Sequence, residues 1–161
     1  MAIYVKYTNP TIDGGVTTAG FEKQFEVSSF QFGIGRGVGS PTGGSTNREA
    51  STPSVSEAVM TKNLDEASGN LIKEAYSGAG KATAVISFVR TDAGGGVTYL
   101  EFTLTNVMLS GYSISSGGEK PTESISLNFT KIETKIIPQN ADGTAGTAFP
   151  VTYDLATQKL T

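Results

Sequence analysis

Three stretches of this chain alternate apolar and polar residues, and in each of them the alternation changes register part-way along. In residues 121–139 the apolar positions pass from odd to even numbers: Ile125, Leu127 and Phe129, then Ile132 and Ile136. A period of two is typical of a strand with one buried and one solvated face. One extra residue near Thr130 or Lys131 would exchange the two faces, as a β-bulge does.

The same change occurs in residues 25–34, at Ser28 and Ser29, and in residues 99–109, around Thr105 and Asn106. A long strand that changes register suits a coiled sheet or a barrel better than a flat sheet. Three such strands in one chain predict an all-β fold built as a bent, closed layer.

Composition and length agree with that prediction. The chain has 161 residues, 20 of them Gly, with only 17% charged residues, which favours one domain over residues 1–161 with many turns. Further short strands are expected near the N-terminus (Ile3, Val5, Tyr7), over 54–62 with Val55 and Val59 inward, over 82–90, and at Val151, Tyr153 and Leu155. The tail after Leu155 is expected to fray.

One helix is predicted within residues 64–80. Ser68 is its expected N-cap and Gly78 its end, and its apolar stripe is Leu71, Ile72, Ala75 and Tyr76. Residues 35–53 form a long polar loop with almost no large apolar side chain. This loop is either a flexible surface segment or an extension that orders against a neighbouring subunit.

The residue types needed for catalysis are scarce. Histidine and cysteine are both absent, which removes the commonest general base, thiol nucleophiles and the usual zinc ligands. We therefore expect no enzymatic activity, no metal and no cofactor. The net charge of −3 includes no basic stripe, so no nucleic-acid partner is expected. Phe30 and Phe32 are expected to be core aromatics.

No run of apolar residues is long enough to span a bilayer, so we expect no membrane insertion. The N-terminus MAIYVKYTNP lacks the pattern of a cleavable signal peptide. The expected location is the cytoplasm, and if the protein leaves the cell, it does so by a route that does not use such a signal.

The order of these segments resembles the haemolysin-coregulated protein (Hcp) family, the secreted tube protein of bacterial type VI secretion. The matching segments cover most of the chain: Asp13-Gly14, FEVSSFQFGIGR, VMTKNLDEASGNLIKEAYSG, YLEFTLTNVMLSGYSIS, PTESISLNFTKIETKIIPQ and NADGTAG. Gln31 and the two Phe beside it stand where relatives often carry Ser and Trp. The resemblance implies a compact, bent β-barrel of two antiparallel sheets with one flanking helix.

The resemblance also implies a structural subunit that forms homo-hexameric rings, which stack into a tube and carry small effectors. The implied partners are the sheath proteins and the tip spike protein. The implied location is the bacterial cytoplasm, where the tube is assembled, followed by secretion without a cleavable signal peptide. Ser29 and Gln31, which alternate with the inward Phe30 and Phe32, are expected to face the lumen and contact effectors. Gly43, Arg48 and Glu49 in the polar loop are expected to contact the next ring.

Other functions fit parts of the same pattern. A phage tail-tube protein would be built by the same physics. A secreted carbohydrate-binding β-sandwich would need exposed aromatic residues along one groove, for which Tyr4, Tyr99 and Tyr112 are the candidates. An enzyme is the alternative that the composition favours least.

Overall fold

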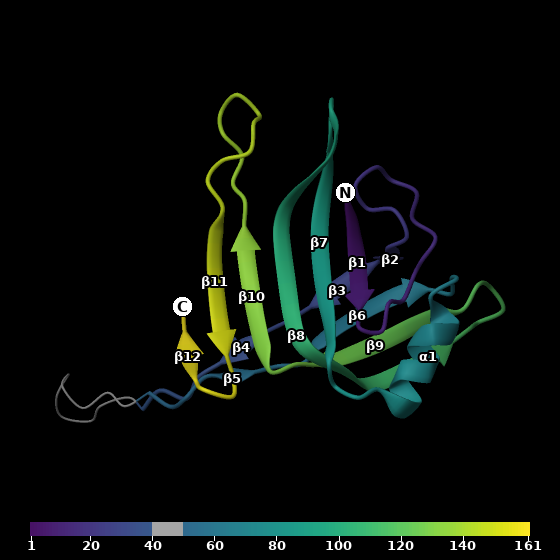
Figure 1. Cartoon of the computed structure of the whole chain (residues 1–161), viewed down its shortest axis with the longest axis horizontal. Coiled ribbons are helices and arrows are strands. Elements are labelled where there is room, and N and C mark those ends of the chain that lie inside the picture. Colours follow the sequence, from purple (N-terminus) through teal and green to yellow (C-terminus); the bar gives the residue numbers. More distant parts are fainter. Residues whose placement is uncertain (40–49) are drawn as a thin grey trace.

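The computed structural model describes residues 1–39 and 50–161 of the chain (Figure 1). Its single described α-helix is α1 (Ser68–Ser77). The strands are, in order, β1 (Ala2–Thr8), β2 (Phe25–Val27), β3 (Ser29–Gln31), β4 (Ile34–Gly35), β5 (Ser54–Val55), β6 (Ala58–Asn63), β7 (Ala82–Asp92), β8 (Gly95–Ser115), β9 (Thr122–Asn128), β10 (Lys131–Ile136), β11 (Phe149–Asp154) and β12 (Lys159–Leu160).

Two antiparallel sheets share the long strand β8. The first, which we call sheet A, has the order β12-β11-β10-β8-β7-β1-β2. The second, sheet B, contains β3, β6, β9 and the C-terminal half of β8. Figure 1 shows the strands of sheet B lying crosswise to the upright strands of sheet A. The prediction of a bent, two-sheet β-fold with one flanking helix is confirmed.

All three predicted register changes lie where the chain leaves one sheet for the other. At Ser28 it passes from β2, paired with β1, to β3, paired with β6. At Asn106 it passes, within β8, from pairing with β7 to pairing with β9. At Thr130 it passes from β9 in sheet B to β10 in sheet A. Changing sheets exchanges the buried and exposed faces, which explains the pattern.

Two of these stretches are not single strands, contrary to our expectation. Residues 121–139 are divided into β9 and β10, and residues 25–34 into β2, β3 and the short β4. Only β8 continues through its corner, where Asn106 has a φ of 54° and is the extra residue of a bulge opposite β7. Within the described residues no ladder joins β2 to β3, so the layer is bent but not closed, contrary to our expectation. At that edge the two sheets meet through the chain at Ser28 rather than through strand pairing.

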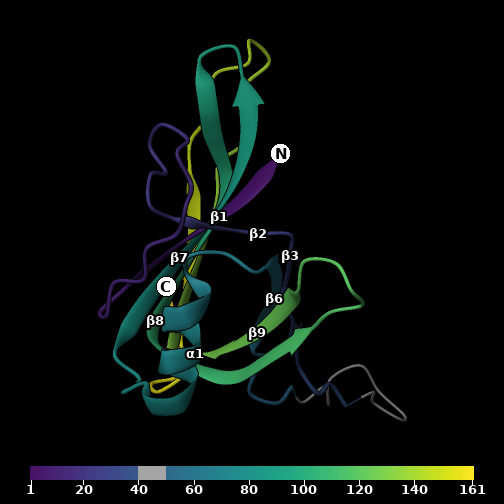
Figure 2. The ribbon, with the colours of Figure 1, turned by 90° about the vertical axis from the view of Figure 1, so that its right-hand side faces the viewer.

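The core lies between the two sheets and is closed at one end by α1 (Figure 2). Phe30 and Phe32 pack into an aromatic cluster centred on Phe102, with ring centroids 4.9 and 5.8 Å from its own. Their predicted place in the core is thus confirmed. The aliphatic part of the core comes from both sheets and the helix: Val5, Met60, Leu71, Ile86, Leu104, Ile125 and Leu127.

The helix is rotated relative to the prediction. Leu71 is buried, but Ala75 is exposed and Tyr76 is 88% exposed; Ala67 and Ser68 are buried instead. Ser68 is the first residue of the helix rather than its N-cap, because the N-cap position is Ala67. The Ala67 amide donates a hydrogen bond to the Asp65 carboxylate at 2.9 Å, just before the helix. The helix ends before Gly78, as expected.

Two smaller predictions are also corrected. Ala58, Met60 and Lys62 are the inward residues of β6, whereas Val59 lies on the opposite face and is only half-buried. The tail does not fray completely, because Lys159 and Leu160 form β12 and pair with β11.

Candidate functional site

The face of sheet B that points away from the core is polar and carries no charged side chain. Residues directly opposite one another in an antiparallel sheet share a face, and here they form rows across the strands. These rows are Gln31, Val59, Ser126 and Gly111; Ser29, Thr61, Ser124 and Ser113; and Asn63, Thr122 and Ser115. Hydroxyl and amide groups therefore dominate a continuous surface, which we call the polar face.

Ser29 and Gln31 both lie on the polar face and are exposed. Their exposure follows from the inward position of Phe30 between them, which is partly buried against the core, since successive strand residues point to opposite sides. The Ser29 hydroxyl contacts the Thr61 hydroxyl at 2.5 Å, and Ser28 donates to the Thr61 carbonyl at 3.0 Å. Hydrogen bonds between short side chains thus connect the strands at this surface, and these side chains also remain available to a partner.

Gly43, Arg48 and Glu49 lie outside the described residues. The described ends of their loop form a ribbon, in which β4 pairs with β5 and the Ser51 amide donates to the Gly37 carbonyl.

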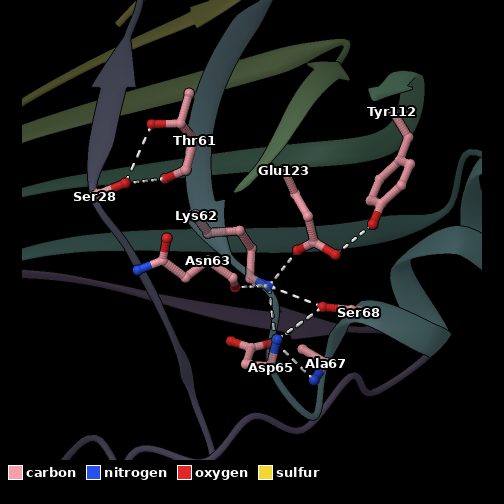
Figure 3. Close-up of polar contacts among 9 residues, drawn as sticks. All are labelled: Ser28, Thr61, Lys62, Asn63, Asp65, Ala67, Ser68, Tyr112 and Glu123. Carbon is pink, nitrogen blue, oxygen red and sulfur yellow. Dashed lines mark hydrogen bonds and ion pairs between the residues drawn. The ribbon is translucent and has the colours of Figure 1, made fainter. Parts of the chain in front are cut away.

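Directly beneath the polar face lies a buried ionic network (Figure 3). Lys62 and Glu123 are opposite each other in β6 and β9, and both side chains are 0% exposed. Lys62 Nζ lies 2.6 Å from Glu123 Oε2 and 2.8 Å from Asp65 Oδ1, and it also donates to the Asn63 carbonyl at 3.0 Å. The Tyr112 hydroxyl donates to the other Glu123 oxygen. The network thus joins sheet B to the start of α1.

Burial alone would raise the pKa of Glu123, but the hydrogen bonds from Lys62 and Tyr112 outweigh it and lower this pKa below its ordinary value. Burial, followed by the bond to Glu123, raises the pKa of Tyr112. The lowered pKa keeps Glu123 ionised opposite Lys62, and the raised pKa keeps Tyr112 neutral beside it. Such a pair positions strands and a helix; it presents no ionisable group poised for proton transfer near neutral pH.

Our sequence analysis did not single out Lys62 and Glu123. The signal was present: Glu123 has the odd numbering of the buried Ile125 and Leu127, and Lys62 has the parity of Met60. Opposite charges on two core-facing positions of different strands are a reason to expect a buried pair.

Other sites that the sequence left open are not formed by the described residues. Across 1–39 and 50–161 no cluster of acidic residues is arranged to hold a metal ion. The three tyrosines of the carbohydrate-binding alternative have separate contacts: Tyr4 is buried beside Thr18, Tyr99 packs on Phe88, and Tyr112 donates a hydrogen bond to Glu123. α1, the one helix described, is too short and too polar to cross a membrane.

Comparisons with known proteins agree with this geometry. The profile of the family described as "Type VI secretion system effector, Hcp" matches residues 4–136. The protein named hcp1 of Pseudomonas aeruginosa is 35% identical over 101 residues, which is 62% of each chain, so this chain spans less than two thirds of that relative.

Two solved structures resemble the whole chain. A structure titled "Structure of a type six secretion system protein" has a TM-score of 0.88 at 26% identity and covers 99% of both chains. Hcp1 of Salmonella typhimurium has a TM-score of 0.74 at 22% identity, covers 99% of this chain and 98% of its own, and supports the fold. The family profile, the curated relative and the two-sheet fold agree: this chain belongs to the Hcp family of type VI secretion proteins.

Proposed function

We propose that residues 1–161 form one domain that acts as a structural subunit of the type VI secretion inner tube. Six copies form a ring, rings stack into a tube, and the polar face of sheet B lines the lumen. In this role the chain is assembled in the cytoplasm and expelled together with sheath-driven tip components and small effectors, without performing catalysis.

The observation that carries this proposal is the polar face itself. The outer side of sheet B carries no charged side chain and only two sizeable apolar ones, Val59 and Met108. It therefore neither repels a passenger of either charge nor holds it by a large apolar contact. Ser29, Thr61, Ser124 and Ser113 offer hydroxyl groups in one row across four strands. Such a surface suits a channel that holds a folded protein and later releases it.

The buried Lys62–Glu123 pair, which lies beneath the polar face, is a second observation in favour of this role. A fixed cross-strand ion pair holds β6 and β9 in register, so the hydroxyl groups above it keep their spacing. A rigid wall loses little conformational freedom on contacting a passenger.

Negative-stain electron microscopy of the purified chain, with size-exclusion chromatography, tests the assembly. We expect six-fold rings with an open centre. A monodisperse monomer at all concentrations would contradict the proposal, and a closed particle without a central hole would contradict the lumen assignment.

The lumen assignment has a second test in Gln31. The variant Gln31→Arg should assemble normally while retaining less of a co-expressed small effector, because a bulky charge replaces an amide on the contact surface. Gln139→Arg, the same change at an exposed loop position away from sheet B, is the matched control. Equal effector retention by Gln31→Arg and by the unmodified chain would remove Gln31 from the contact surface.

A further inference from the structure

The helix α1 closes one end of the core, yet few of its own side chains are buried there (Figure 2). Of its ten residues Ser68 and Leu71 are buried, and Ile72 is half-buried. Most helical stability in proteins comes from packing an apolar face against another element. One fully buried Leu provides little of that packing for a helix of this length.

The sequence of α1 does not favour a helix strongly either. Gly69, its second residue, is a poor helix former, and an isolated helix of ten residues is marginal in water. Among the described residues no side chain caps its N-terminus, and its first turn holds no acidic residue. The helix therefore depends on its contacts with the rest of the fold.

Polar contacts hold α1 at both of its ends. At its beginning, Lys62 Nζ in β6 lies 2.8 Å from Asp65 Oδ1 and donates to the Ser68 hydroxyl at 3.3 Å (Figure 3). Near its other end, the hydroxyl of the buried Tyr7 in β1 donates to Glu74 Oε2 at 3.2 Å. We call these contacts the β6 tether and the β1 tether.

The β6 tether adjoins the ion pair beneath the polar face. Lys62 and Glu123 are 0% exposed while α1 is in place. A movement of α1 away from sheet B would take Asp65 and Ser68 from Lys62 and admit water, and an ion pair is weaker where the dielectric constant is higher. Since this pair holds β6 and β9 in register, the position of α1 also affects the polar face above it.

We propose that α1 is a lid, which opens as one unit while both sheets stay folded and thereby exposes the Lys62 ammonium group. Segments with few buried apolar contacts open locally at a lower free energy than the core. Both tethers break in the same event, because the helix is not stable without them. The lid is a property of the single subunit, and its effect on a lumen wall rests on the proposed function.

Two readouts measure this opening. Hydrogen–deuterium exchange reports the hydrogen-bonded helical amides of residues 71–78. Acetylation by an N-hydroxysuccinimide ester, followed by peptide mass spectrometry at low conversion, reports Lys62, with the exposed Lys73 of α1 as the internal reference. We expect both readouts to give one opening constant, at least about tenfold larger than the global unfolding constant from a urea titration.

The variant Tyr7→Phe keeps the buried ring and removes the β1 tether, which lies at the end of α1 away from Lys62. It should raise both opening constants by about threefold to tenfold, through the loss of one hydrogen bond. The matched control is Tyr4→Phe on the same strand, which removes the contact between the Tyr4 hydroxyl and Thr18 Oγ1 at 3.1 Å. That contact persists when the lid opens, so Tyr4→Phe should leave both opening constants unchanged.

Equal acceleration by Tyr7→Phe and Tyr4→Phe would show that α1 opens only when the whole fold opens, and it would overturn the lid. Acetylation of Lys62 at the rate of global unfolding, with faster exchange in α1, would also overturn it, because the helix would then fray without uncovering the pair. Gly69→Ala should lower both constants by about two- to fivefold, since a Cβ there meets no atom within 4 Å and Ala is the better helix former. Unchanged constants in Gly69→Ala would contradict an opening that unfolds the helix.

All variants are compared in one size-exclusion fraction at one concentration, because assembly changes apparent stability. Microscopy of the same fraction reports rings independently of both readouts. Rings formed by a chain without a lid would overturn this inference and leave the proposed tube subunit intact. A lid in a chain that forms no ring would support the inference and refute the tube subunit.

Discussion

Replacing Lys62 by Met tests whether the buried ion pair holds sheet B together. Met has nearly the shape of Lys, so the change removes the charge while filling the space. It leaves the Glu123 carboxylate with no exposed surface and with Tyr112 as its remaining partner. Removing one partner of a buried pair ordinarily costs about 3–5 kcal/mol.

The pH dependence gives a sharper figure. Without Lys62 no cation opposes the effect of burial on Glu123, so the pKa of its carboxyl in the folded variant rises above the ordinary value of 4.5. The folded carboxyl therefore takes up a proton. Protonating a carboxyl with the ordinary pKa of 4.5 at pH 7 costs about 3.4 kcal/mol, since each unit between pKa and pH corresponds to about 1.4 kcal/mol. The folded variant then binds one more proton than the unfolded chain, so its stability rises as pH falls.

In the unmodified chain the sign is opposite. The folded pKa of Glu123 is lowered, so its stabilising contribution is present above pH 4.5 and is lost as pH falls through the folded pKa. The difference in unfolding free energy between the two proteins should therefore shrink by about 1.4 kcal/mol for each pH unit from 7 toward 5.

Urea unfolding followed by far-UV circular dichroism measures this difference, since the chain has no Trp. Protein concentration is held fixed because assembly contributes to stability. The double variant Lys62→Met/Glu123→Gln has no carboxyl at this position and should lose the pH slope. A loss below about 1 kcal/mol at pH 7, or a difference that does not change between pH 7 and 5, would refute the reasoning.

Three further substitutions test local features by the same unfolding measurement. Asn106→Ala should lower the free energy of unfolding by about 1–2 kcal/mol, because Asn106 has a φ of 54° and donates to Thr130 Oγ1 at 3.0 Å. Asn106→Gly should cost less, because Gly adopts this φ freely. The reverse order would contradict a role for the left-handed backbone at this corner. Asp65→Ala should cost at least about 1 kcal/mol, because it removes both the ion pair with Lys62 and the bond from the Ala67 amide just before α1; unchanged helix content and stability would exclude this role for Asp65. Gly14→Ala should cost about 1–3 kcal/mol or more, because a Cβ there would lie 2.6 Å from Phe25 Cα, and a stability equal to that of the unmodified chain would show that the turn moves freely.

The β class, the one helix and the three places where the chain bends were predictable from sequence. Alternation records which side of each strand is buried, and that side is decided residue by residue along the chain. The changes at Ser28, Asn106 and Thr130 were therefore visible as breaks in a pattern. The exposure of Ser29 and Gln31 followed in the same way from the inward position of Phe30.

Contacts between residues that are far apart in the sequence were harder to predict. Lys62 and Glu123 are 61 residues apart, and nothing local to either position shows that the two strands are adjacent. The same holds for the rotation of α1: Leu71 was correctly placed inward, but Ala75 and Tyr76 belong to the helical stripe and are nevertheless exposed. A helix face is buried only where another element covers it.

The sequence by itself thus determined the local conformations and the sidedness of the strands, because both depend on neighbours a few residues away. Tertiary structure alone decided that the register changes are passages between two sheets, that an ion pair lies under the polar face, and that the described residues leave apolar strand faces uncovered at one end. Those features depend on which distant segments meet, and sequence periodicity carries no record of that pairing.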